Sequence, residues 1–236
     1  MRLDKYLADM GIGTRSEIKT KIRKGNVTVD GSIIKDAGFQ VSDESVVTFC
    51  GQEVSYEAYV YYMLNKPSGV ISASDDETQT TVIDLITERN RRDLFPVGRL
   101  DKDTEGLLLI TNDGPLAHRL LSPRHHVDKV YYARIDGIVS DQEIKAFSSG
   151  LTVDDTFTAM PADLKVLRTV PENRTSEVEI TIREGKYHQI KRMFHAVDME
   201  VLFLKRIQMG SLVLDPALSP GEYQRLTESE LHALQI

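Results

Sequence analysis

The sequence predicts an α+β protein in which a small helix–helix–hairpin unit precedes a larger unit built on a mixed, mainly antiparallel sheet flanked by helices. Two observations favour this class. Helical periodicity gives way to short strand patterns within the first fifty or so residues, and beyond them strand and helix patterns alternate irregularly. An irregular order favours a mixed sheet over a doubly wound parallel one. We expect the small unit at 1–55, a linker at 56–60 and the large unit at 61–236.

The small unit begins with two predicted helices. Apolar residues recur at helical spacing over 3–10, which predicts an amphipathic first helix. Thr14 and Glu17 in "TRSE" have the spacing of a capping box, which predicts the start of the second helix. Asp30 and Gly31 then favour a tight hairpin turn between short strands, and "SVVTFC" is typical of a last strand.

The large unit alternates buried strand patterns with amphipathic helix patterns. Pro115 suits the first turn of a helix, Asp141 is expected to cap another, and alternation over 177–183 indicates a half-buried strand. Strands are predicted at 59–64, 106–111, 129–135, 177–183 and 201–207, and helices at 80–92, 116–121, 141–150, 188–197 and 227–235.

Charge is unevenly distributed along the chain. Residues 1–35 hold eight basic and four acidic residues, a net charge of +4, whereas the whole chain carries −7, so the remainder carries −11. Arg15, Lys19 and Arg23 follow at i, i+4 and i+8 and should line one stripe of the second helix. A single basic helix is usually only a solvated face, but an asymmetry between units favours binding of phosphate groups.

Several classes of protein are disfavoured by composition. The single cysteine, Cys50, excludes an internal disulfide and fits a reducing compartment. Charges interrupt the first ten residues, and no apolar run approaches the roughly 18 residues of a membrane helix. We therefore expect a soluble cytoplasmic protein without a membrane partner. Because the chain lacks a cysteine pair, HExxH, a P-loop and GxGxxG, we expect neither a metal nor a cofactor.

The stretch "GRLDKDTEG" at 98–106 places many charges between two apolar segments. A turn explains Asp103 and Thr104, whose side chains commonly hydrogen-bond to nearby backbone. It leaves Arg99 and Asp101 unexplained, because Leu100 between them should be buried. A carboxylate beside basic groups stays ionised at neutral pH, so Asp101 would be available as a nucleophile or base.

Four motifs resemble those of the RNA pseudouridine synthases, in the order expected for that family: "VGRLDKDTEGLLLITNDG", "SPRHHVDKVYYARI", "EGKYHQIKRMFHAV" and "PGEYQRLTESE". The pattern is most similar to the RsuA-type branch, which acts on small-subunit ribosomal RNA. The N-terminal unit resembles the S4-type RNA-binding domain that this branch carries.

The resemblance implies site residues as well as a fold. Asp101 matches the essential aspartate, Tyr131 the tyrosine that stacks on the uracil, and Lys191 the cation that pairs with the aspartate, with Arg192 a rival for that role. Arg99 would meet a phosphate or hold the flipped nucleotide, and Lys66 would form a wall of the cleft. The RNA-binding residues expected in the N-terminal unit are Arg2, Arg15, Lys19 and Arg23.

The resemblance further implies that the protein, as a monomer, isomerises one uridine of 16S ribosomal RNA at a uridine-516-type site, in an assembly intermediate of the small subunit. One alternative is a synthase for 23S ribosomal RNA. Another is a ribosome-assembly factor that binds RNA without catalysis, although a pure binder would not need Asp101, Tyr131 and Lys191. A carbohydrate hydrolase is disfavoured, since it would normally need a second acid at a defined separation.

Overall fold

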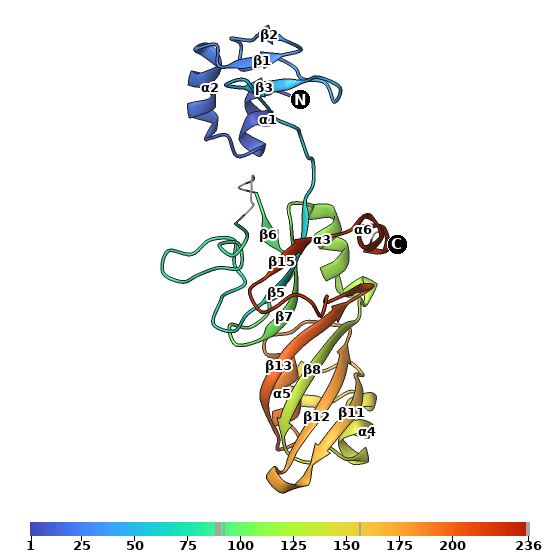
Figure 1. Cartoon of the computed structure of the whole chain (residues 1–236). Coiled ribbons are helices and arrows are strands. Elements are labelled where there is room, and N and C mark those ends of the chain that lie inside the picture. The colour runs from blue at the N-terminus through green and yellow to red at the C-terminus, as the bar shows by residue number, and fades with distance from the viewer. Residues whose placement is uncertain (88–90, 92, 156, 235–236) are drawn as a thin grey trace. The chain divides into compact units, whose positions relative to one another are not determined.

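The computed structural model describes residues 1–87, 91, 93–155 and 157–234. The chain divides into two compact units (Figure 1). The first comprises Met1–Val60 together with Ile86–Leu94, and the second comprises Tyr61–Leu85 together with Phe95–Ile236.

The first unit packs two helices against a small antiparallel sheet. Its sheet has the strand order β2-β1-β3-β4, and its core gathers apolar side chains from α1, α2 and the first strands. The elements are α1 (Leu3–Asp9), α2 (Arg15–Arg23), β1 (Val27–Val29), β2 (Ser32–Ile33), β3 (Val47–Phe49) and β4 (Gln52–Glu53).

Local signals explain the start of this unit. Thr14 and Glu17 form the predicted capping box: the hydroxyl of Thr14 accepts from the Glu17 N–H, and the Glu17 carboxylate accepts from the Thr14 N–H. The hairpin turn has φ of 51° at Asp30 and 77° at Gly31, the left-handed pair that suits a two-residue turn between twisted strands. Both predictions are confirmed.

The second unit is built on one mixed sheet. Its strands run in the order β11-β12-β8-β13-β7-β5-β15, and every pair is antiparallel except β7 with β13. This confirms the predicted fold class. The strands are β5 (Tyr61–Lys66), β6 (Phe95–Pro96), β7 (Glu105–Thr111), β8 (Lys129–Asp136), β9 (Thr152–Asp154), β10 (Phe157–Thr158), β11 (Asp163–Val170), β12 (Thr175–Ile182), β13 (Glu200–Met209), β14 (Leu212–Val213) and β15 (Tyr223–Arg225). The helices are α3 (Gly114–Leu121), α4 (Asp141–Ser149), α5 (Gln189–His195) and α6 (Glu228–Leu234).

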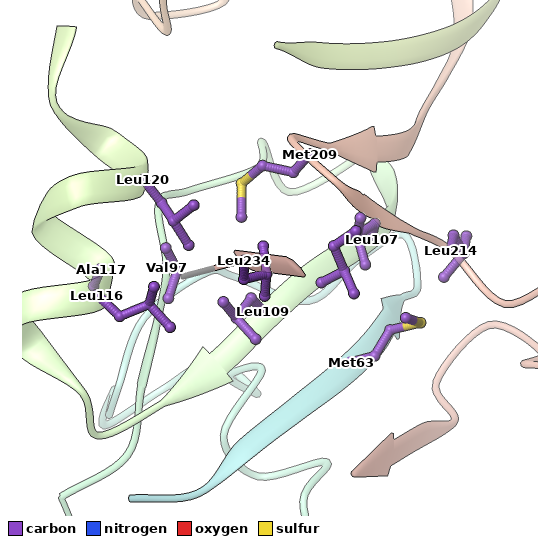
Figure 2. Close-up of a cluster of buried hydrophobic side chains, with 11 residues drawn as sticks. Met63, Val97, Leu107, Leu109, Leu116, Ala117, Leu120, Met209, Leu214 and Leu234 are labelled. Carbon is purple, nitrogen blue, oxygen red and sulfur yellow. The ribbon is translucent and has the colours of Figure 1, made fainter. Parts of the chain in front are cut away.

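Strand β7 is the centre of the core. Leu107 and Leu109 of this strand pack with Leu116 and Leu120 of α3 and with Leu234 of α6 (Figure 2). The four residues 107–110 are completely buried, so both faces of the strand are covered. The strand therefore gives the loop that precedes it a rigid support.

Of the helices in the described ranges, none is both long enough and apolar enough to cross a membrane.

The helix predicted at 80–92 is wrong for the described residues. Thr81 and Asp84 exchange the hydrogen bonds of a capping box, but residues 82–87 form turns that do not continue as a helix. The chain passes from here into the first unit, where buried Arg91 donates to the carbonyl of Glu57 and pairs with Asp93. Residues 88–90 and 92 of the prediction lie outside the described part.

Two further details differ from the prediction. Helix α4 is capped by Ser140, whose hydroxyl accepts from the Gln142 N–H, while Asp141 is the first helical residue. Strand β11 was not predicted. Its edge position leaves most of its residues at least partly exposed, which weakens the alternation that marks other strands.

Candidate active site

The motif "GRLDKDTEG" forms the loop that leads from β6 into the buried strand β7. Arg99, Leu100 and Asp101 all line a pocket at this loop, and of the three only Leu100 is buried. The carbonyl of Asp101 accepts from the Thr104 N–H at 3.1 Å, which closes the turn. The loop thus presents the aspartate at the end of a rigid strand.

Lys66 lies under this loop and is fully buried. Its Nζ donates to the carbonyls of Pro67, Lys102 and Thr104 at 3.1, 3.1 and 2.8 Å. Burial lowers the pKa of Lys66 to about 8, although three carbonyl acceptors favour the ammonium form. Lys66 was expected in a cleft wall that contacts RNA. In the structure its side chain is buried instead, and its hydrogen bonds hold the loop from below.

The loop meets helix α5 through Lys191. The Nζ of Lys191 lies 3.3 Å from Oδ2 of Asp101 and 2.6 Å from Oδ1 of Asp103. The hydrogen bond from Lys191 lowers the pKa of Asp103. Burial opposes the charged form of Lys191, but its bond to Asp103 and the charge of Asp101 outweigh burial and raise its pKa.

The turn is held differently from the sequence-based expectation. The carboxylate of Asp103 is mostly exposed and accepts a hydrogen bond from Lys191. Its partner therefore lies on α5, far from the turn in the sequence. The hydroxyl of Thr104 is buried and has no hydrogen-bond partner among the described residues. The backbone bond at Thr104 and the ammonium of Lys66 hold the turn instead.

Arg192, the rival partner for Asp101, faces a different group. Its guanidinium pairs with Asp154, lies 5.0 Å from the ring centroid of Phe157 and donates to the carbonyl of Tyr187 at 3.3 Å. Of the two neighbouring cations, it is Lys191 that contacts the aspartate.

Tyr131 lies in the same pocket as Asp101. It comes from β8 and is 7% exposed. The neighbouring Tyr132 points to the opposite face of the strand, where the centroids of its ring and the Phe203 ring are 6.1 Å apart. The pocket has a cavity volume of about 90 Å³. Its polar lining residues include Arg99, Asp101, Thr104, Tyr131, Lys186, His188, Gln189 and Lys191.

His188 is a further pocket residue, which the sequence analysis did not assign to the site. Its Nε2 lies 3.6 Å from Oδ1 of Asp101, and its backbone φ of 49° lies in the left-handed region, which is uncommon for a residue with a side chain. The signal available in the sequence was its spacing from Lys191, since positions i and i+3 lie on one side of a helical turn.

The predicted RNA-binding residues of the first unit fall into two groups. Arg15, Lys19 and Arg23 are exposed along α2, and no other residue in the described ranges forms an ion pair with them. Arg2 differs, because its guanidinium makes two hydrogen bonds, of 3.0 and 2.9 Å, to the buried carboxylate of Asp4. The guanidinium of Arg2 is therefore occupied by a contact at the start of α1, whereas the exposed side chains of the three α2 residues can bind phosphate groups.

Comparison with known proteins assigns both units. The model of the RNA pseudouridylate synthase family matches residues 60–196, and the model of the S4 domain matches residues 1–47. The chain is 48% identical over 236 residues to the uncharacterized RNA pseudouridine synthase YtzG of Bacillus subtilis, covering 99% of this chain and 98% of that one. It is 39% identical to the ribosomal small subunit pseudouridine synthase A of Escherichia coli K12, covering 98% of each chain.

A solved structure agrees with these matches. The crystal structure of a pseudouridylate synthase, 36% identical, superposes with a TM-score of 0.69 over 99% of both chains. The fold and the matches define an RNA-modifying isomerase that carries an S4 domain. The chain belongs to the RNA pseudouridine synthase family, within its RsuA-type branch. The predicted family and the predicted class of enzyme are confirmed.

Proposed function

We propose that this protein converts one uridine of 16S ribosomal RNA to pseudouridine, at a uridine-516-type site. The substrate is supported by relatives named ribosomal small subunit pseudouridine synthase A, which are 39–40% identical over nearly the whole chain. The observation that carries the chemistry is the position of Asp101, which lines one pocket with Tyr131 and lies 3.3 Å from Lys191.

The proposed reaction needs the uridine to leave its stack, because a base inside folded RNA cannot be reached. Tyr131 stacks on the extruded uracil while Asp101 acts as a nucleophile or a base. The bond between ribose C1′ and uracil N1 breaks, the base rotates, and C1′ bonds to C5. The proton on C5 is then lost and N1 gains one, so atoms balance without a second substrate. Lys191 keeps the carboxylate charged and oriented, and Arg99 holds the nucleotide through a phosphate.

Binding of the RNA is divided between the two units in this proposal. Residues 1–55 act as the S4 RNA-binding domain, 56–60 as a linker and 61–236 as the catalytic domain. The exposed stripe of Arg15, Lys19 and Arg23 supports phosphate contacts by the first domain. Because one chain supplies the aspartate, the tyrosine and the lysine, we propose a monomer, which acts in the cytoplasm on a small subunit that is still being assembled.

Mapping pseudouridine in ribosomal RNA tests this proposal directly. RNA from cells with and without the gene is compared over the complete 16S and 23S sequences. We expect one 16S pseudouridine to disappear in the deletion and to return when the gene is restored. Loss of a 23S pseudouridine would assign the large-subunit substrate, and an unchanged map of both RNAs would favour an assembly factor without this activity.

A further inference from the structure

Tyr187 is an aromatic side chain with unusually little cover. It is 76% exposed, a larger fraction than for any other large hydrophobic side chain in the described ranges. Its ring stacks on that of His188 with centroids 3.8 Å apart and planes inclined by 18°. The imidazole covers part of the ring, while the residue as a whole stays largely open to solvent. A single exposed aromatic ring is not unusual by itself, so it is the position of this ring that indicates a role.

The loop that carries Tyr187 is held firmly. Arg192 donates to the carbonyl of Tyr187 at 3.3 Å, and the side chain of Gln189, which is 4% exposed, braces the turn on both sides. Its Oε1 accepts from the Lys186 N–H at 3.0 Å, and its Nε2 donates to Glu184 at 2.9 Å. The ring is therefore presented on a fixed backbone, so a partner that stacks on it would cost little ordering of the loop.

The two rings lead outward from the catalytic carboxylate. The imidazole of His188 lies 3.6 Å from Asp101, and Tyr187 covers the imidazole. The ring separation of 3.8 Å is close to the rise of about 3.4 Å between stacked bases. Lys186, exposed and adjacent in sequence, adds a cation beside the rings at the pocket. An aromatic face next to a cation is the combination that binds single-stranded RNA through a base and its phosphate.

We propose that Tyr187, backed by His188, is a stacking platform for the base of the nucleotide next to the target uridine. The inference rests on the proposed function, because the target uridine occupies the pocket at Asp101. It goes further by assigning a second base-binding position, which accepts an unpaired base with little preference for its identity, since every base has a π-face. The platform would hold the flanking nucleotide while its neighbour is extruded.

A fluorescence experiment tests the platform separately from catalysis. The probes are short single-stranded RNAs with one uridine, carrying 2-aminopurine directly 5′ of it in one probe and directly 3′ in the other. Wild type is compared with Tyr187→Phe, which keeps the ring, and with Tyr187→Ala and Tyr187→Leu, which remove it. Leu167→Ala, at an exposed apolar residue of β11, is the matched surface control. Isomerisation is followed in parallel by tritium release from 16S ribosomal RNA, labelled at C5 of its uridines, in partly assembled small subunits.

We expect wild type, Tyr187→Phe and Leu167→Ala to quench one of the two probes. Tyr187→Ala and Tyr187→Leu should lose the quench and bind that probe roughly 5- to 100-fold more weakly. Quenching and affinity that persist without the ring would overturn the platform, as would the absence of quenching in wild type. A quench that depends on Tyr187 without tritium release supports the platform and counts against the proposed reaction. Tritium release without a Tyr187-dependent effect leaves the reaction intact and overturns the platform.

Discussion

The ammonium of Lys191 on α5 lies 3.3 Å from Oδ2 of Asp101 on the loop before β7. The contact joins two segments that are far apart in the sequence, the loop before β7 and the first turn of α5. The buried strand β7 fixes the position of the loop, and α5 begins directly after His188, whose backbone is left-handed. The ammonium of Lys191 thereby fixes the position of a partly buried carboxylate that lines the pocket.

Lys191 and Arg192 are expected to behave differently when each is replaced by methionine. Lys191→Met removes a charge-assisted hydrogen bond to the carboxylates, which is worth about 1.5–3 kcal/mol, so the single-turnover rate at saturating RNA should fall roughly 10- to 100-fold. Arg192→Met breaks a contact to Asp154 and should leave that rate within about twofold. Equal losses in the two variants would contradict the assignment of Lys191 as the partner of Asp101.

Lys66 predicts a dependence of stability on alkaline pH. Burial lowers its pKa to about 8 in the folded protein, against about 10.4 in an unfolded chain. Between these values the unfolded chain binds more protons, so the contribution of Lys66 to the free energy of unfolding should rise with pH. Urea unfolding of wild type and Lys66→Met over this window measures the difference. We expect a steeper rise in wild type, and parallel curves would show that Lys66 does not titrate there.

Gly106 is expected to tolerate no side chain. Its φ is +99°, and a Cβ there would lie 2.2 Å from the carbonyl oxygen of Arg206 on the parallel neighbour β13. Gly106→Ala should therefore cost about 3 kcal/mol or more in the free energy of unfolding. Gly69 is a matched control, with a φ of +87° and no atom within 4 Å of a Cβ, so Gly69→Ala should cost only about 1–2 kcal/mol. Similar costs at both positions would argue against a close approach of β13.

The basic stripe of α2 makes a prediction about salt. Replacing Arg15, Lys19 and Arg23 by alanine should weaken RNA binding. The slope of log K against log salt concentration should fall by about 0.7–0.9 for each phosphate group that the triple variant no longer neutralises. Lys145→Ala, at an exposed lysine of α4, controls for a general change in charge. A slope unchanged in the triple variant would remove the stripe from the RNA interface.

Local patterns explain how much of this molecule could be predicted. The capping box of Thr14, the Asp30–Gly31 turn and the buried run of β7 all act through neighbours in the chain. Predictions failed where contacts with residues far away in the sequence decide the local structure. The same capping-box pattern at Thr81 closes only a turn, because the chain continues into the first unit.

The candidate site shows the same division. A motif can assign Asp101, Tyr131 and Lys191, and the fold brings the three to one pocket. It cannot reveal that Lys66 is buried under the loop, because that depends on which carbonyls converge on its ammonium. The position of His188 beside Asp101 likewise depends on the left-handed backbone of His188 itself, directly before α5.

Asp101→Asn tests the central claim most directly, because it keeps the size of the side chain and removes only its charge and nucleophilicity. The measurement is the single-turnover rate of pseudouridine formation in 16S ribosomal RNA, with RNA affinity measured on the same preparations. We predict that the rate falls by at least about 100-fold while the affinity stays within about twofold of wild type. Pseudouridine formed at an undiminished rate by Asp101→Asn would contradict the account.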